Sequence, residues 1–319
     1  MSPTTLLLFY CLAVFAASAL GGLLPLFVKL GHTGTQVMMS AVAGFMLGVA
    51  VLHMLGHALP EAGSTQAALL WLLGGFLVMF FTERFFAYHH HDLPAEQACG
   101  HIHAEPPKTR LHWVGAVAGM SIHSLISGTA LAAAVAAATL PAGGETNTGP
   151  AGLAGFAVLL AILGHKPLDA LTVVGLAHAS GLPRSRAHAL NLVFALVEPL
   201  GVLAAWWGLS TFFADHPGVL PAALAFSAGT FLCIALSDLL PEVQFHKHDR
   251  LKLSAALLLG LGAAWGVGLL EGEHHHHGHD HAEHAEGDGH GGHRDHHPAG
   301  EPDAHAVHGD HDGHEHHDH

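Results

Sequence analysis

Three polar groups of residues interrupt long apolar stretches of the sequence. They are His123-Ser124-Leu125-Ile126-Ser127-Gly128, His165-Lys166-Pro167-Leu168-Asp169 and Glu198-Pro199-Leu200-Gly201. Each group lies about halfway along a stretch long enough to cross a bilayer, where an ionisable side chain is costly unless a partner or a cation compensates it. Imidazole, carboxylate and hydroxyl groups are metal ligands, so the three groups predict a metal site if their helices meet.

Residues four apart on a helix share one face, which places His123 beside Ser127 and His165 beside Asp169. Nitrogen and carboxylate ligands suit Zn²⁺ and also Fe²⁺, Mn²⁺, Co²⁺ and Ni²⁺. Each histidine alone could instead be a hydrogen-bonded interior residue, and each proline a packing kink. Two histidines, Asp169 and Glu198 at matched depth favour the metal site over that structural alternative.

Lys166 complicates the predicted site. A charged ammonium cannot be a ligand, and it repels a second cation, so it could replace the charge of one metal in a site that would otherwise hold two. It could also be a structural ion-pair partner of Asp169 or Glu198. Both roles can hold at once.

The three cysteines give no second ligand set. Cys11 and Cys233 lie in apolar stretches and Cys99 in a polar one, without any Cys-x-x-Cys pair. The sequence therefore supports neither a disulfide framework nor a thiolate metal clamp.

The composition predicts an all-α integral membrane protein. Half of the 319 residues are hydrophobic, 11% are charged, and the mean hydropathy is +0.40. The apolar residues form long blocks rather than amphipathic stripes. Eight blocks approach or exceed the roughly 20 residues that span a hydrocarbon core. They cover residues 4–28, 36–59, 66–86, 111–138, 151–178, 187–209, 220–240 and 251–270.

Basic residues predict the orientation of these helices. Apart from Lys166 and Arg294, they gather in or beside the loops after the first, third, fifth and seventh helices. Because such residues collect on the cytoplasmic side, both termini are predicted to be extracytoplasmic, in the cell (inner or plasma) membrane.

Short motifs indicate an internal repeat. The second helix carries Ala43-Gly44 and ends in Leu59-Pro60-Glu61, and the seventh carries Ala228-Gly229 and ends in Leu240-Pro241-Glu242. The two helices run in opposite directions by the charge argument. An inverted repeat of this kind places a transporter's substrate site near the midplane.

Two rows of possible ligands recur at i, i+4 and i+8. They are His53, His57 and Glu61 toward the outer end of the second helix, and Asp238, Glu242 and His246 at the inner end of the seventh. Weak ligands at each mouth would let an ion step between water and the central site. Glu61 and Glu242 could equally be interfacial caps and His246 a loop residue, whereas His53 and Asp238 lie deeper.

Histidine is concentrated in two polar segments. One is the loop at about 88–110, cytoplasmic by the charge argument, and the other is the tail at 272–319, which carries 18 of the 34 histidines. The tail lacks the apolar residues of a core, so it is predicted to be disordered and to capture metal weakly. We therefore expect a transmembrane domain at 1–271, followed by this tail.

The three polar groups, together with Ala-Gly-Thr-Phe-Leu and Leu-Pro-Glu of the seventh helix, resemble the ZIP (Zrt/Irt-like) family of divalent-metal transporters over about residues 4–271. The resemblance implies metal uptake into the cytoplasm by alternating access. It also implies helices grouped three, two and three with an inverted repeat, and frequent homodimers. Zn²⁺ is the expected substrate, with Fe²⁺, Mn²⁺, Cd²⁺, Co²⁺ and Ni²⁺ as other candidates.

The resemblance also implies roles for single residues. His123 and Ser124 match a metal-binding pair of the fourth helix, and His165, Asp169 and Glu198 match ligands of the fifth and sixth. Two departures from the family pattern favour a single metal. Ser127 stands where many members have Asp, and Lys166 stands where two-metal members have a ligand.

Other function classes fit less well. A cation-diffusion-facilitator exporter also uses His and Asp four apart, but eight helices and the Glu198-Pro199-Leu200-Gly201 group argue against it. A metal sensor that does not transport would not need polar residues at mid-membrane. A metalloprotease would need His-Glu-x-x-His, which is missing from the sequence. No enzyme activity, catalytic cofactor or nucleic-acid partner is expected, and the partners are the metal ion and the lipid bilayer.

Overall fold

The computed structural model describes residues 2–23, 31–86, 111–139, 154–212, 216, 218–239 and 249–271. Within these residues there are helices and no strand, and eight helices are long and apolar enough to cross a membrane. The predicted all-α membrane class is confirmed, while the three-two-three grouping stays a prediction. Glu242, His246, the histidine-bearing loop at 88–110 and the tail lie outside the described residues.

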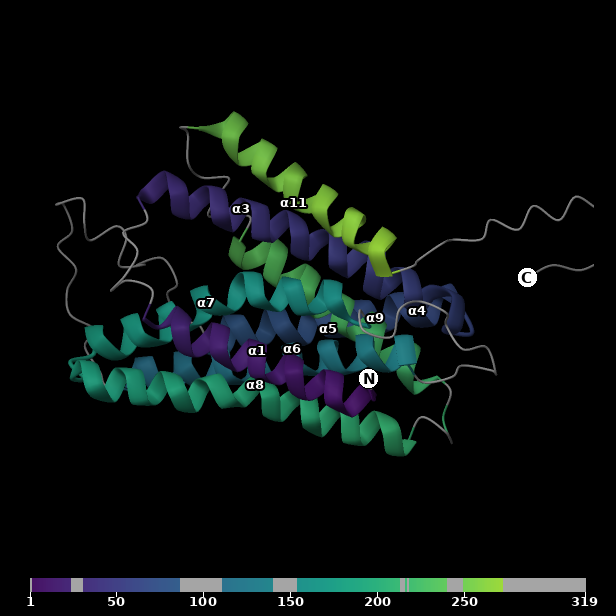
Figure 1. Ribbon diagram of the computed structural model, residues 1–319, viewed down its shortest axis with the longest axis horizontal. Helices are drawn as coiled ribbons and strands as arrows, with labels where there is room; N and C mark the ends of the chain where they lie inside the picture. Colours follow the sequence, from purple (N-terminus) through teal and green to yellow (C-terminus); the bar gives the residue numbers. More distant parts are fainter. Residues whose placement is uncertain are drawn as a thin grey trace, which may run out of the picture. The chain divides into compact units, whose positions relative to one another are not determined.

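The helices follow the predicted apolar blocks (Figure 1). In chain order they are α1 (Pro3–Gly21), α3 (His32–Gly48) with η1 (Val49–Leu55) and α4 (Gly56–Glu61), α5 (Thr65–Phe86), α6 (Leu111–Thr139), α7 (Phe156–Ala179), α8 (Arg184–Phe212), α9 (Val219–Cys233) with η3 (Ile234–Leu239), and α11 (Arg250–Glu271).

Two helix ends lie five or more residues from the predicted ones. The first helix was expected to run to Val28, but α1 ends at Gly21, where two successive glycines lower the helix propensity. The fifth was expected from Ala151, but α7 begins at Phe156, after Gly155 with a left-handed φ of 69°. Glycine adopts that conformation without steric cost, so Gly155 sets the start of α7.

Two of the spans change from α-helix to π-helix near their ends. Segment η1 begins five residues after Gly44, and η3 begins five residues after Gly229. His53 and Asp238 are each the fifth residue of their π segment. π turns are rare overall, and those that occur often lie at functional sites. Their recurrence at matching positions indicates that these two helices are related.

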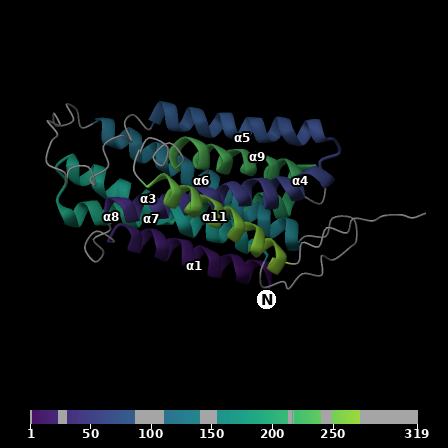
Figure 2. The same cartoon turned by 90° about the horizontal axis from the view of Figure 1, so that it is seen from above.

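A constant spacing relates two pairs of packed helices. Helix α3 runs along α11, and α5 runs along α9 (Figures 1 and 2). Helices α5 and α11 both have 22 residues and start 185 positions apart, at Thr65 and Arg250. The same 185 positions separate the starts of η1 and η3, at Val49 and Ile234. The two Leu-Pro-Glu motifs, which begin at Leu59 and Leu240, are four positions closer together than this spacing.

Glycines make the same close contact in both pairs. In the α3–α11 pair Gly44 faces Leu257 and Gly260 faces Ala41, and in the α5–α9 pair Gly229 faces Leu72 and Gly75 faces Phe226. A Cβ atom on any of these glycines would overlap the backbone carbonyl oxygen that it faces. Small residues let helix backbones approach closely in lipid, so each pair is held by two reciprocal glycines.

The three polar groups lie on α6, α7 and α8, which pack on one another and on α1. Helices α6 and α8 approach most closely at Gly128 and Gly201. A Cβ on Gly128 would lie 2.7 Å from the carbonyl oxygen of Glu198, and one on Gly201 would lie 2.7 Å from that of Leu125. This contact brings the part of α6 that carries Ser124 and Ser127 close to the part of α8 that carries Glu198.

Candidate metal centre

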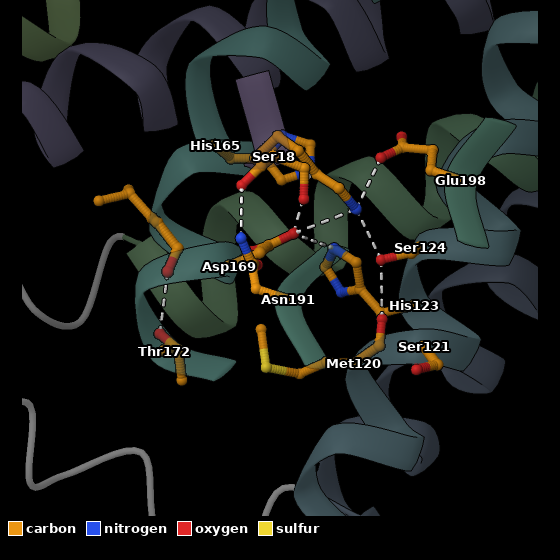
Figure 3. A network of polar contacts seen from close by, with 12 residues as sticks. Ser18, Met120, Ser121, His123, Ser124, His165, Asp169, Thr172, Asn191 and Glu198 are labelled. Atoms are coloured by element: carbon orange, nitrogen blue, oxygen red, sulfur yellow. Dashed lines mark hydrogen bonds and ion pairs between the residues drawn. The ribbon is translucent and has the colours of Figure 1, made fainter. Parts of the chain in front are cut away.

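His123 of α6 and His165 and Asp169 of α7 converge on one point (Figure 3). Their ligand atoms all lie within 4.8 Å of one another. Oδ2 of Asp169 is 3.8 Å from Nε2 of His123 and 4.0 Å from Nε2 of His165. A tetrahedral zinc site has ligand separations of roughly 3.3 Å, so a contraction of less than about 1.5 Å would close these atoms around an ion.

The backbone of α7 orients the His165 ring. Its Nδ1 lies 2.8 Å from the carbonyl oxygen of Ala161. Because a carbonyl only accepts, Nδ1 carries the proton in this contact and Nε2 keeps its lone pair, as a metal ligand requires. The ring also stands edge-on to Phe231 of α9, with centroids 6.3 Å apart. The imidazole is thus fixed on one side by a hydrogen bond and on another by packing.

Lys166 is completely buried beside this group. Its Nζ lies 2.7 Å from Oε2 of Glu198, donates a 2.7 Å hydrogen bond to Oγ of Ser124, and is 3.9 Å from Oδ2 of Asp169. The ammonium also lies 4.6 Å from the ring centroid of Phe194. A buried charge is tolerated only with partners of this kind, so the α7 lysine and the α8 carboxylate depend on each other.

Two residues predicted as metal ligands therefore surround the ammonium in this structure. Glu198 is fully buried and forms the ion pair with Lys166, outside the group formed by His123, His165 and Asp169. Ser124 accepts from Lys166 and donates its own hydroxyl proton to the carbonyl of Met120 at 2.9 Å. Their part as direct metal ligands stays a prediction.

The remaining α6 serine is also buried. Ser127 is one turn from His123, and its hydroxyl has no hydrogen-bond partner among the described residues. It lies on the helix that carries His123, as the i+4 spacing predicts, and stays a candidate for the ion pathway.

The outer row of predicted ligands lies on a different helix. His53 is buried in η1, with Nε2 2.8 Å from the carbonyl oxygen of Ala264 in α11, and His57 places Nδ1 2.8 Å from the carbonyl oxygen of His53. Glu61 is exposed at the end of α4. Asp238 lies in η3 by its backbone. Within the described residues, none of His53, His57 and Glu61 joins the group around Asp169.

Sequence reasoning missed two side chains that support the centre. Asn191 of α8 is buried and donates from Nδ2 to the carbonyl oxygens of Ser18 and Ala19 in α1, at 3.1 and 3.4 Å. Phe194, one turn further along α8, lies beside Lys166. The only sequence signal for Asn191 was a polar residue in an apolar stretch, and Phe194 gave none.

The charges of the centre suit one divalent ion. Lys166 and Glu198 neutralise each other, which leaves the carboxylate of Asp169 with two imidazoles. Imidazole nitrogen and carboxylate oxygen are a typical zinc ligand set, also compatible with other first-row divalent metals. A water or substrate position is needed to complete four-coordination.

Comparisons with known proteins agree with this arrangement. The family model described as ZIP Zinc transporter matches residues 95–270, just over half of the chain. Zinc transporter ZIP9-B of Xenopus laevis is 33% identical over 160 residues, covering 48% of this chain and 45% of that protein. Zinc transporter ZIP9 of Macaca fascicularis is 32% identical over 157 residues, covering 44% and 61%. This chain spans about half the length of these relatives. It belongs to the ZIP zinc transporter family.

Proposed function

We propose that this protein carries divalent transition-metal ions across a membrane, with zinc as the principal substrate. The observation that carries the proposal is the buried convergence of His123, His165 and Asp169 on two membrane-spanning helices. The family match supports it, and the relatives named above are described as zinc transporters. In this proposal the three side chains form the central station, and the resemblance to the family gives the direction, into the cytoplasm.

Lys166 acts in this proposal as a resident positive charge in place of a second ion. Its ammonium is surrounded by Glu198, Ser124 and Asp169, three residues that the family resemblance assigns to metal binding. An ion placed among the same atoms would have to displace the ammonium or be repelled by it. The centre then holds one metal ion.

The pathway extends from this station to both mouths. His53 and His57 offer imidazoles on the η1 side, and Ser127 offers a hydroxyl one turn from His123. Asp238 in η3, with Glu242 and His246 beyond the described residues, forms the inner row. Weak ligands along the route allow an ion to leave each position, and alternating access exposes the central station to one side at a time.

The histidine-rich segments are auxiliary in this proposal. Residues 1–271 form the transport domain, with both termini extracytoplasmic, and residues 272–319 bind metal without building the membrane site. A homodimer in the cell membrane is the expected assembly. Removing the tail should leave flux at saturating metal unchanged, because no tail residue is assigned to the centre.

Zinc uptake into vesicles containing the purified protein tests this function. His123→Ala, His165→Ala, Asp169→Asn and Glu198→Gln should each lower flux by about 100-fold or more, because each removes a ligand or leaves a buried charge without its partner. Ser121→Ala and His178→Ala are matched controls on the same helices. Ser121 donates its hydroxyl to the Val117 carbonyl of its own helix, and His178 is exposed at the end of α7. Normal flux in any two of the four variants would refute the site.

A further inference from the structure

A second polar cluster lies between α5 and α9, apart from the centre described above. Oγ of Ser237 donates to Oε2 of Glu83 at 2.7 Å, and the Cys233 thiol donates to the same oxygen over 3.7 Å. Sγ of Cys233 and Oγ of Ser237 are 3.6 Å apart, one helical turn from each other. A thiol, a carboxylate and a hydroxyl from two helices therefore meet at one point.

This position is costly for both ionisable groups. Glu83 is half-buried two residues before the end of the apolar span Thr65–Phe85, and Cys233 is fully buried. A carboxylate within a membrane span indicates a functional site by default, since its desolvation must be compensated. The hydroxyl and thiol contacts are two compensating contacts of this kind, and a thiol and a carboxylate that meet are also two groups that a divalent cation can bind.

The related helix pair shows that packing does not require this cluster. The positions 185 residues away from Cys233, Ser237 and Glu83 in the α3–α11 pair are Gly48, Leu52 and Gly268. Both pairs nevertheless pack through the same reciprocal glycines. The thiol, hydroxyl and carboxylate are therefore additions to one pair rather than part of the shared helix contact.

The distances match the requirements of a metal ion. With metal–sulfur and metal–oxygen bonds of about 2.3 and 2.0 Å, tetrahedral geometry separates sulfur from oxygen by roughly 3.5 Å. The Cys233–Glu83 separation of 3.7 Å is close to that value. An ion could bridge the two atoms with little movement of either helix. The Ser237 hydroxyl would keep its hydrogen bond to the carboxylate and so hold its orientation.

We propose that Cys233 and Glu83 form a second metal-binding site, selective for divalent ions that accept thiolate, such as Zn²⁺, Cd²⁺ and Co²⁺. The ion binds Sγ of Cys233 and Oε2 of Glu83, the thiol proton leaves to solvent as H⁺, and water completes the coordination. Ser237 is a positioning residue.

Two protein ligands make this site weaker than the central one, as suits an ion that must be released again. Its place in the fold fits such a role. Ser237 belongs to η3, next to Asp238, which the sequence assigns to the inner row of the pathway. The binding claim itself does not depend on transport, so it is testable even if the proposed function fails.

Cobalt absorption of the full-length protein tests the site, because thiolate bound to Co²⁺ gives an intense near-ultraviolet charge-transfer band that imidazole and carboxylate do not give. The natural protein should show this band. Cys233→Ala should lose it. Glu83→Gln should weaken Co²⁺ binding measured at the band by about tenfold or more, and Ser237→Ala by about tenfold.

Matched variants keep the test specific. Cys11→Ala and Cys99→Ala remove the other two thiols and should each keep the band, and His123→Ala disrupts the central site and should also keep it. An unchanged band in Cys233→Ala, or the same affinity in Glu83→Gln as in the natural protein, would overturn the proposal. Loss of the band in His123→Ala would overturn the independence of the two sites. If Cys233→Ala does not fold, the Co²⁺ affinities of Glu83→Gln and Ser237→Ala, measured at the same band, test the proposal in its place.

Discussion

The α3–α11 and α5–α9 pairs share one packing scheme but carry different chemistry. Reciprocal glycines hold both pairs, at positions related by the same 185-residue spacing. One polar position recurs at this spacing, His53 and Asp238, but Glu83, Ser237 and Cys233 have no polar counterpart. The first pair has the buried His53, which contacts the Ala264 carbonyl, and the second has Glu83, Ser237 and Cys233.

This difference separates two kinds of constraint. The glycines that recur at the fixed spacing serve helix packing, which a membrane protein achieves through small residues and close backbones. Polar residues that do not recur are not needed for this packing, and their presence within a membrane span needs a functional reason. The comparison therefore directs attention to Glu83, Ser237 and Cys233, which have no polar counterpart in the other pair.

The largest effect should come from filling the glycine contacts. Gly75→Ala and Gly260→Ala each force a Cβ against a backbone carbonyl and should destabilise the protein by about 3 kcal/mol or more. Gly74→Ala and Gly262→Ala, where a Cβ meets open space, should instead stabilise it by up to about 1 kcal/mol through helix propensity.

Thermal denaturation in detergent measures these opposite signs. The comparison predicts that the two test variants lose stability by similar amounts, because their positions are equivalent. A clear loss in only one of them would show that the two pairs are not held in the same way.

A smaller effect should come from removing one polar contact of the α3–α11 pair that has no equivalent in the α5–α9 pair. Ser40 of α3 is buried and donates to the carbonyl oxygen of Leu253 in α11 at 2.6 Å. In the other pair, Ala225 stands at the position equivalent to Ser40 and Ala68 at the position equivalent to Leu253, and both are buried. Ser40→Ala should cost about 1 kcal/mol, the usual worth of one hydrogen bond. The same thermal measurement checks it, and a loss as large as that of Gly260→Ala would contradict the dominance of the glycine contacts.

Much of the fold could be predicted from the sequence. Long apolar blocks are sufficient to indicate eight spans, and i, i+4 spacing is sufficient to place Asp169 beside His165, because both depend on local geometry alone. The ends of α1 and α7 were predicted less well, because Gly21 and Gly155 interrupt stretches whose hydropathy does not change.

The partners of the site residues could be predicted only in part. The ion pair between Lys166 and Glu198 was one of two alternatives, and choosing between them needs the approach of α7 to α8 in three dimensions. The Cys233–Glu83 contact could not be found, because its two residues are 150 positions apart, Cys233 is a single polar residue in an apolar block, and Glu83 stands beside Arg84 at the end of another. Contacts of this kind depend on helix packing, which leaves no periodic pattern in the sequence.

The central claim is that His123, His165 and Asp169 hold one ion while Lys166 occupies the place of a second. Zinc content per chain tests it most directly, in protein that lacks residues 272–319 and the loop histidines and carries Cys233→Ala. The parent protein should bind one ion, His165→Ala none, and Lys166→Asp two, because the substitution replaces a repelling charge with a ligand. Two ions in the parent protein, or one in both the parent and Lys166→Asp, would contradict the claim.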